Sequence, residues 1–200
     1  MENKKKDKID FSYNLNNFEP YIYFKNIHFH YNIIYKNIKK EIEEKKNLKL
    51  QGKEIFEKEI EFLSNELNNH DFYFSCLIEP RFFSEEKISK ELFICIEKNF
   101  KNLEILKEKI LNKSLEIKDS GWIWVILEEK EKLNIVKTNY HSCQWNDNFY
   151  PLIGIDLWEH SYYFDYGPEK EKYVNNLINN LINWEYISNI YHKYISEKFS

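Results

Sequence analysis

The spacing of apolar residues divides the chain into a helical first part and a mixed second part. From residue 18 to residue 46, apolar and aromatic residues recur every three or four positions, as one face of a helix requires. The same spacing returns over residues 55–76, and Gln51-Gly52 interrupts the pattern between the two runs. A short connection between two long helices predicts an antiparallel helical hairpin.

The period of the pattern changes in the second part of the chain. Residues 84–113 again show helical spacing, and the chain after Pro168 is predicted to be helical to its end. Between them, residues 122–127 and 133–136 are short and rich in β-branched and aromatic side chains, which predicts a β-hairpin. Residues 151–155 predict a third strand that begins with a proline.

These elements predict an α+β fold. We expect an N-terminal long antiparallel helical hairpin, followed by a C-terminal α/β domain with a three-stranded antiparallel sheet. Glu79-Pro80 ends the second helical run. The expected domains are therefore residues 1–83 and residues 84–200.

Composition and charge narrow the classes of function. Of the 200 residues, 42% are hydrophobic and 31% are charged, a balance typical of a folded globular chain. The net charge of −4 gives no reason to expect nucleic acid as a partner, and no apolar run is long enough to predict a membrane span. Three scattered cysteines without a Cys-x-x-Cys spacing, and a start without a signal-like segment, predict a cytoplasmic location.

The segment with the clearest chemical content is Gly154-Ile155-Asp156-Leu157-Trp158-Glu159-His160. An apolar strand runs directly into an acid, and a histidine follows four residues later. Because an unpaired buried charge is costly, a metal ion shared by Asp156 and His160 would explain the pattern. The alternative is that Asp156 caps the next helix beside an incidental histidine. The spacing alone leaves both interpretations open.

Two further histidines lie in the predicted helical hairpin. His30 and His70 each stand among aromatic residues, where a single histidine is more often a hydrogen-bonded core residue than a metal ligand. Face-to-face helices would bring the two imidazoles together with Asp156 and His160. Three nitrogens and one oxygen without a thiolate suit iron or manganese, with one coordination position left for a small ligand.

Residues 154–166 resemble the hallmark segment of the iron/manganese superoxide dismutases, in which Asp-x-Trp-Glu-His precedes a pair of tyrosines. His30 also follows Pro20 at the distance where that family has its first ligand. Other family landmarks occur in the right order, and these are Phe18-Glu19-Pro20, Asn69-His70-Asp71-Phe72-Tyr73, Ser120-Gly121-Trp122-Ile123-Trp124 and Leu181-Ile182-Asn183-Trp184-Glu185.

The resemblance implies a set of site residues. The implied metal ligands are His30, His70, Asp156 and His160. The implied aromatic walls of the site are Trp122, Trp124 and Trp158, although core filling alone would also explain them. In the family, the residue at Glu159 reaches across a dimer interface to a ligand histidine of the partner subunit. The resemblance therefore implies a homodimer, with Tyr163 also near the interface.

The chain departs from the family pattern around the site. The family usually has histidine and tyrosine at the positions of Ile34 and Ile38, where they admit substrate and relay protons. The family also has a glutamine that acts as a hydrogen-bond donor near the metal. In iron enzymes this glutamine stands at the position of Glu66. In manganese enzymes it stands where alignment places His141. We expect His141 to contact the water bound at the metal. The His70-Asp71-Phe72-Tyr73 environment favours iron over manganese.

The resemblance implies the conversion of superoxide to dioxygen and hydrogen peroxide at one iron or manganese ion per chain. A first alternative is a protein that keeps this fold with little or no turnover and has a structural or interaction role. The missing gateway residues favour that alternative, whereas four retained ligands oppose it. A different non-haem iron enzyme and a zinc hydrolase are further alternatives, although the sequence contains no general base distinct from the ligands.

Overall fold

The computed structural model describes residues 17–50, 57–142 and 149–199 of the chain. The α-helices within these residues are α1 (Phe24–His28), α2 (Lys36–Leu50), α3 (Glu57–Ser75), α4 (Lys90–Phe100), α5 (Leu103–Leu115), α6 (Glu159–Tyr166), α7 (Lys170–Asn180) and α8 (Trp184–Phe199). The strands are β1 (Gly121–Leu127), β2 (Leu133–Asn139) and β3 (Pro151–Asp156). A π-helix, η2 (Phe29–Tyr35), joins α1 to α2, and short 3-10 turns occur at η4 (Pro80–Phe82), η5 (Glu85–Lys87) and η6 (Glu129–Glu131).

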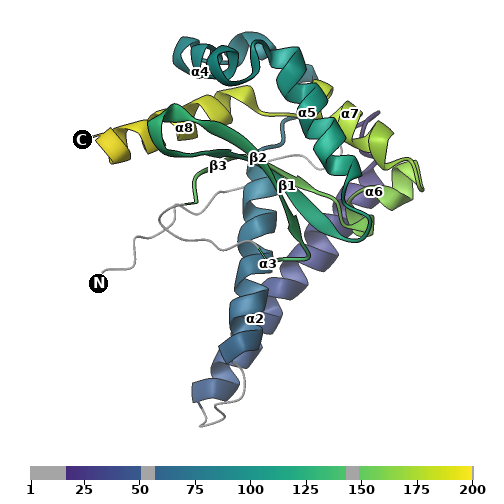
Figure 1. Ribbon diagram of the computed structural model, residues 1–200. Coiled ribbons are helices and arrows are strands. Elements are labelled where there is room, and N and C mark those ends of the chain that lie inside the picture. Colours follow the sequence, from purple (N-terminus) through teal and green to yellow (C-terminus); the bar gives the residue numbers. More distant parts are fainter. Residues whose placement is uncertain (1–16, 51–56, 143–148, 200) are drawn as a thin grey trace.

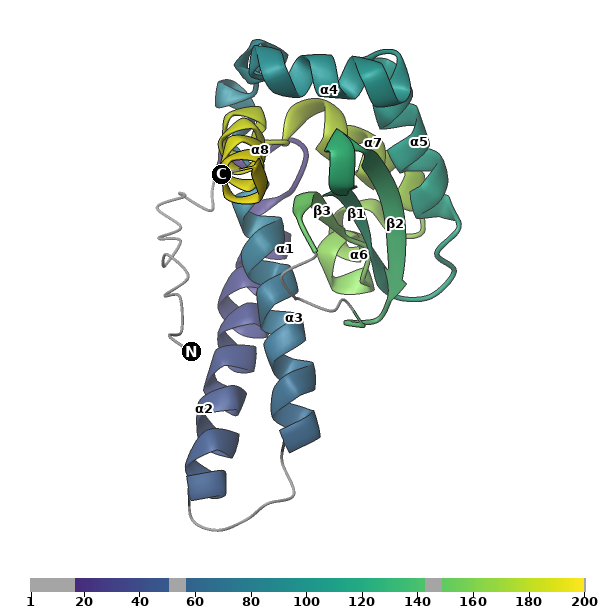
Figure 2. The same ribbon diagram turned by 60° about the vertical axis from the view of Figure 1, so that its left-hand side comes forward.

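The N-terminal part is the predicted helical hairpin. α2 and α3 lie side by side and project from the rest of the molecule as an arm (Figures 1 and 2). The Lys45 ammonium lies 2.6 Å from the Glu59 carboxylate and links the two helices on the outside. The apolar residues buried between the helices are Ile38, Ile42 and Leu63. The connection that contains Gln51-Gly52 lies outside the described residues.

The C-terminal part contains a three-stranded antiparallel sheet in the order β2-β1-β3, which confirms the predicted hairpin and third strand. Trp124 in the central strand pairs with Val136 on one side and with Gly154 on the other. A methyl group on Gly154 would lie 2.6 Å from the Trp124 ring and 2.9 Å from the Phe72 ring. A glycine is therefore required where β3 passes between these two aromatic side chains.

The two parts meet along a broad contact. α3 packs against β3, and α1, which leads into the hairpin through η2, packs against α6. A β-bridge between Leu77 and Ile182 joins the end of α3 to the segment before α8. This packing brings the C-terminal end of β3 to His30 and His70, at the end of the hairpin away from its connection. The observed architecture confirms the α+β fold with a helical N-terminal part and a three-stranded antiparallel sheet.

Three predicted helix boundaries are wrong. The first helix begins at Phe24, inside the run of helical spacing that was expected from residue 18. The single helical stretch expected over residues 84–113 divides into α4 and α5, because Lys101 adopts a φ of 72° and ends α4. The Asn102 side chain then accepts a hydrogen bond of 2.8 Å from the Ile105 N–H and starts α5. The C-terminal stretch is likewise interrupted at residues 181–183 before α8 begins.

None of the helices in the described part of the chain combines the length and apolarity that crossing a membrane requires.

Candidate metal centre

Four side chains from four different elements converge where the hairpin meets the sheet. His30 comes from η2, His70 from α3, Asp156 from the end of β3 and His160 from the first turn of α6. One possible ligand atom from each lies within 4.8 Å of the other three. His30, His70 and Asp156 are fully buried, and the His160 side chain is 15% exposed. Among the described residues, this is the one group of histidine, cysteine, aspartate and glutamate side chains arranged to hold a metal ion.

A single carboxylate oxygen lies at the centre of the cluster. Asp156 Oδ2 is 3.2 Å from the Nε2 atom of His30, 3.6 Å from that of His70 and 3.1 Å from that of His160. Nitrogen and oxygen ligands that share one ion at about 2.1 Å are separated from one another by roughly 3.0–3.6 Å. The observed spacing is therefore the spacing of ligands around one ion.

Hydrogen bonds on the outer side of the cluster fix the orientation of these groups. The His70 Nδ1–H donates to the Glu66 carbonyl oxygen at 2.8 Å, which leaves the lone pair of Nε2 directed to the cluster. The Trp158 N–H donates to Asp156 Oδ1 at 2.9 Å, so that Oδ2 faces the histidines. The site is thus organised by the main chain of α3 and by the turn into α6.

Burial controls the charge of the cluster. It lowers the pKa of His30 to about 4 and that of His70 well below its usual value, so both rings are neutral near pH 7. Burial raises the pKa of Asp156, but the interactions with His160 and His30 outweigh this effect and hold that pKa below its usual range. The carboxylate is therefore a buried negative charge beside two neutral rings. Such a charge needs a positive partner, and a metal ion held by the four groups would supply one.

The residues fit a mononuclear iron or manganese ion. His30 Nε2 is buried and has no hydrogen-bond partner, and it lies where a ligand to a shared ion is needed. The donor set is three imidazole nitrogens and one carboxylate oxygen, without sulfur. A closed structural zinc site would favour thiolates, whereas iron and manganese accept this mixture.

Aromatic side chains enclose the cluster. The Trp122 ring meets the His70 ring edge-on at 5.3 Å, and the Trp158 ring stacks on the His160 ring at 5.8 Å. Trp124 lies one layer further out, where it stacks on Trp122 at 5.5 Å. The sequence-based prediction named these three tryptophans as walls, and the structure places Trp122 and Trp158 against the cluster.

Tyr73 is a wall residue that the sequence-based prediction missed. Its ring stacks on the His30 ring at 5.4 Å, and its hydroxyl lies 3.1 Å from the Tyr173 hydroxyl. Tyr73 follows His70 by three residues on α3, so it lies on the same face of that helix. The three-residue spacing from His70 could have identified Tyr73 as a wall residue from the sequence.

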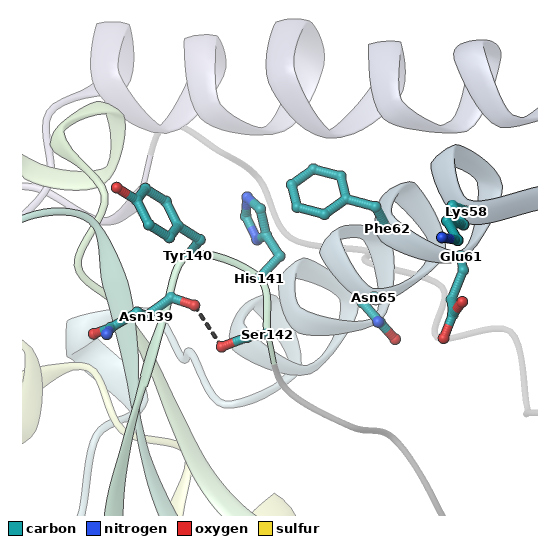
Figure 3. Close-up of a pocket in the computed structure, with 8 residues that line it drawn as sticks. All are labelled: Lys58, Glu61, Phe62, Asn65, Asn139, Tyr140, His141 and Ser142. Atoms are coloured by element: carbon teal, nitrogen blue, oxygen red, sulfur yellow. Dashed lines mark hydrogen bonds between the residues drawn. The ribbon is translucent and has the colours of Figure 1, made fainter. Parts of the chain in front are cut away.

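His141 lies beside the cluster, at the base of a pocket between the first half of α3 and the end of β2 (Figure 3). Its Nδ1 accepts a hydrogen bond of 3.3 Å from the Trp122 Nε1–H, and its Nε2 lies 3.4 Å from Glu66 Oε1. The ring stacks on Trp158 at 4.5 Å and meets Phe62 edge-on at 5.6 Å. The contact with Glu66 was not predicted, since the two residues lie far apart in the sequence.

The remaining predicted residues lie around this core. Glu159 and Tyr163 are exposed on α6, and the Tyr163 side chain has an exposed fraction of 54%. Ile38 is buried in the apolar cluster of the hairpin, and Ile34 is partly buried against that cluster. Both positions where the family has a polar gateway residue, histidine or tyrosine, therefore carry an apolar side chain in this protein.

Comparison with known proteins gives one consistent result. Residues 88–190, more than half of the chain, match the family model for the C-terminal domain of iron/manganese superoxide dismutases. The chloroplastic iron superoxide dismutase 3 of Arabidopsis thaliana is 35% identical over 119 residues, which cover 58% of this chain and 43% of that protein.

Two further relatives extend the comparison. The iron superoxide dismutase of Helicobacter pylori is 32% identical over 127 residues, which cover 63% of this chain and 57% of that protein. The mitochondrial manganese superoxide dismutase of Capsicum annuum is 31% identical over 128 residues, which cover 62% of this chain and 56% of that protein. The chain spans about half the length of the curated relatives it matches. From the match to the family model, the chain belongs to the iron/manganese superoxide dismutase family.

Proposed function

We propose that this protein is a superoxide dismutase, which converts two superoxide ions into dioxygen and hydrogen peroxide at one iron or manganese ion per chain. The observation that carries the proposal is the convergence of three imidazole nitrogens on the buried Asp156 carboxylate. The relatives described above are iron or manganese superoxide dismutases, which supports the same reaction.

The proposed ligands are His30, His70, Asp156 and His160. An ion held by them would supply the electron chemistry, by taking an electron from one superoxide ion and returning one to a second. The protein holds these ligands in fixed orientations, and the rings of Trp122, Trp158 and Tyr73 limit the space around them. His141 stands where a neighbouring group could orient the water that delivers protons to peroxide, and that role stays a prediction.

We favour iron over manganese. The support is the His70-Asp71-Phe72-Tyr73 segment, which resembles the iron enzymes. Both iron and manganese enzymes occur among the relatives, and their names do not separate the two metals.

A second candidate is a protein of this fold with weak or no turnover and a structural or interaction role. The apolar side chains of Ile34 and Ile38 favour it, because neither can relay a proton. The four converging ligands oppose it, since a scaffold gains nothing from a buried carboxylate that needs a cation. We therefore rank slow dismutation above loss of the reaction.

A homodimer formed through α6 is part of the proposal. Tyr163 and Phe164 have exposed fractions of 54% and 67%, and the ligand His160 stands on the same helix. Glu159 is exposed beside it and could reach a partner subunit. Large exposed aromatic side chains next to a site are typical of an interface.

Domain division and location complete the proposal. We propose domains at residues 1–83 and 84–200, because that boundary falls between η4 and η5. We also propose a cytoplasmic location, supported by Cys76 and Cys95, which are buried free thiols. We expect neither nucleic acid nor a membrane among the partners.

Elemental analysis and superoxide consumption, measured on one preparation, test the function. The wild-type chain is expected to carry close to one iron or manganese ion and to consume superoxide. Asp156→Ala is expected to lose both properties, because it removes the carboxylate on which the three imidazoles converge. Asp119→Ala, which removes an exposed carboxylate, is the control and should keep both.

Each other result has a definite meaning. Bound iron or manganese without superoxide consumption would favour the second candidate. A wild-type chain that binds neither metal, or zinc alone, would overturn the proposed function.

A further inference from the structure

We infer that Glu66 is a positioning residue, whose carboxylate holds the His141 imidazole by its Nε2–H while Trp122 holds the opposite ring nitrogen. That Glu66 positions the His141 ring is inferred from the contacts of the two side chains. That this positioning affects dismutation rests on the proposed function.

Hydrogen-bond directions define the state of the His141 ring. The indole Nε1–H of Trp122 can only donate, and it lies 3.3 Å from His141 Nδ1. Nδ1 must therefore accept, which places the single proton of the neutral ring on Nε2. Glu66 Oε1 lies 3.4 Å from that nitrogen. A donor on one side and an acceptor on the other select one tautomer of His141.

The surroundings of the ring explain why an acceptor is needed there. The His141 side chain is 2% exposed, and its faces and edges meet aromatic rings of Trp158, Phe62 and Trp122. These rings offer no strong hydrogen-bond acceptor to Nε2–H. The Glu66 side chain, which is 16% exposed, enters the same enclosure from α3 and supplies the oxygen atom Oε1 as an acceptor. An N–H in such surroundings gains from an acceptor placed beside it.

Glu66 also orients a proposed metal ligand through a different atom. Its main-chain carbonyl accepts the hydrogen bond of 2.8 Å from His70 Nδ1–H. One residue of α3 thus contacts both His70 and His141. A side-chain substitution at Glu66 leaves the carbonyl bond to His70 in place, so it tests the contact with His141 separately.

The contact between Glu66 and His141 distinguishes this site from the pattern of the family. The resemblance leads one to expect one glutamine amide beside the metal, from α3 in iron enzymes or from the sheet in manganese enzymes. This chain has a contacting pair instead, with Glu66 on α3 and His141 after β2. Because the single N–H of His141 faces Glu66 Oε1, a contact of this ring with water at the metal would have to be shared with Glu66, and the geometry points to the pair as the functional unit.

The first test follows the Nε2 proton of His141 by nuclear magnetic resonance on the full chain after chelator treatment. Long-range nitrogen–proton spectra report which ring nitrogen carries the proton, and His141→Gln identifies the signals by their loss. The wild-type ring is expected to be protonated on Nε2 alone. In Glu66→Ala, exchange of this proton with solvent is expected to be at least tenfold faster, whereas Glu66→Gln keeps an oxygen acceptor and slow exchange.

The controls are built into the same spectra. Glu61→Ala removes another carboxylate of α3 that lines the pocket, and it should leave the His141 signals unchanged (Figure 3). The Trp122 indole proton is an internal reference that should stay slow in every Glu66 variant. A wild-type ring protonated on Nδ1, or equal exchange in wild type and Glu66→Ala, would overturn the inference.

The second test measures the consequence for the proposed reaction after reconstitution with manganese or iron. Glu66→Ala is expected to lower kcat at least tenfold at equal metal content, with partial rescue by Glu66→Gln and no change in Glu61→Ala. If the wild type itself does not consume superoxide, the proposed function fails while the proton-exchange result still stands. If the wild type is active and Glu66→Ala matches it at equal metal content, the positioning role fails alone.

Discussion

Single residues in this protein are tightly constrained where aromatic rings approach the main chain. Gly154 is the clearest case, because β3 passes between Trp124 and Phe72 with no room for a further carbon atom. Two residues later the same strand presents Asp156 to the histidines. A displacement of the strand at Gly154 would therefore move the carboxylate as well.

Gly154→Ala is expected to lower the free energy of unfolding by about 1–3 kcal/mol, the usual effect of overpacking a core. Chemical denaturation of the metal-free chain measures it. Trp124→Phe removes the ring atoms that clash, so the double variant should lose less than the sum of the two single losses. Strict additivity, or a Gly154→Ala variant as stable as wild type, would contradict this explanation.

At the scale of elements, helix ends are set by local groups that interrupt an otherwise continuous apolar pattern. Lys101 ends α4 with a positive φ, and Asn102 starts α5 through its side-chain oxygen. The apolar spacing of residues 84–113 continues across this break, which explains why the sequence predicted one helical stretch. Similarly, nothing in the spacing marks the π-helix η2, although that segment carries His30.

Asn102→Ala is expected to cost about 1 kcal/mol in the free energy of unfolding, because the Ile105 N–H loses its capping oxygen. Asn102→Ser keeps an oxygen at the same position and is the matched control. Urea unfolding of both variants measures the difference. Equal stability of the alanine and serine variants would show that this cap does not contribute.

The elements themselves were largely predictable. The hairpin and the terminal helices follow from apolar periodicity, since each buries one side against the core. The three strands follow from short runs of β-branched and aromatic side chains, and β1 and β3 are buried on both sides. The four converging side chains were predictable only through motif spacing and the family resemblance, because each histidine alone is compatible with a core position. The Glu66–His141 contact was not predictable, since it depends on how α3 packs beside the end of β2.

At the scale of the whole molecule, the buried histidines couple stability to pH. Burial lowers the pKa of His30 and of His141 to about 4, from an ordinary value of 6.5. Between these values the unfolded chain binds more protons than the folded chain, so acid favours unfolding. Glu66 has the opposite effect on stability. Burial raises its pKa from 4.5 to about 7, so between these values the folded chain binds a proton that the unfolded chain does not, and acid favours folding at this residue. His70 shifts in the same direction as His30 and His141, so the histidines dominate.

The metal-free chain is therefore expected to lose several kcal/mol in the free energy of unfolding as the pH falls from 6.5 toward 4. Urea unfolding at a series of pH values measures the slope. His30→Gln should reduce it, and His192→Gln, at a side chain 47% exposed, is the surface control. A stability that is flat or that rises with acid in this window would contradict the expectation.

The division of the four converging side chains along the chain has a consequence for biosynthesis. His30 and His70 lie in the first half of the sequence, whereas Asp156 and His160 lie in the last quarter. A nascent chain on the ribosome thus exposes only two imidazoles until β3 and α6 have emerged. Two donors hold an ion weakly compared with four, so a stray cation captured early can still dissociate. With the proposed ligand set, tight metal binding would begin only when the carboxylate has emerged, so the order of synthesis would delay the choice of metal.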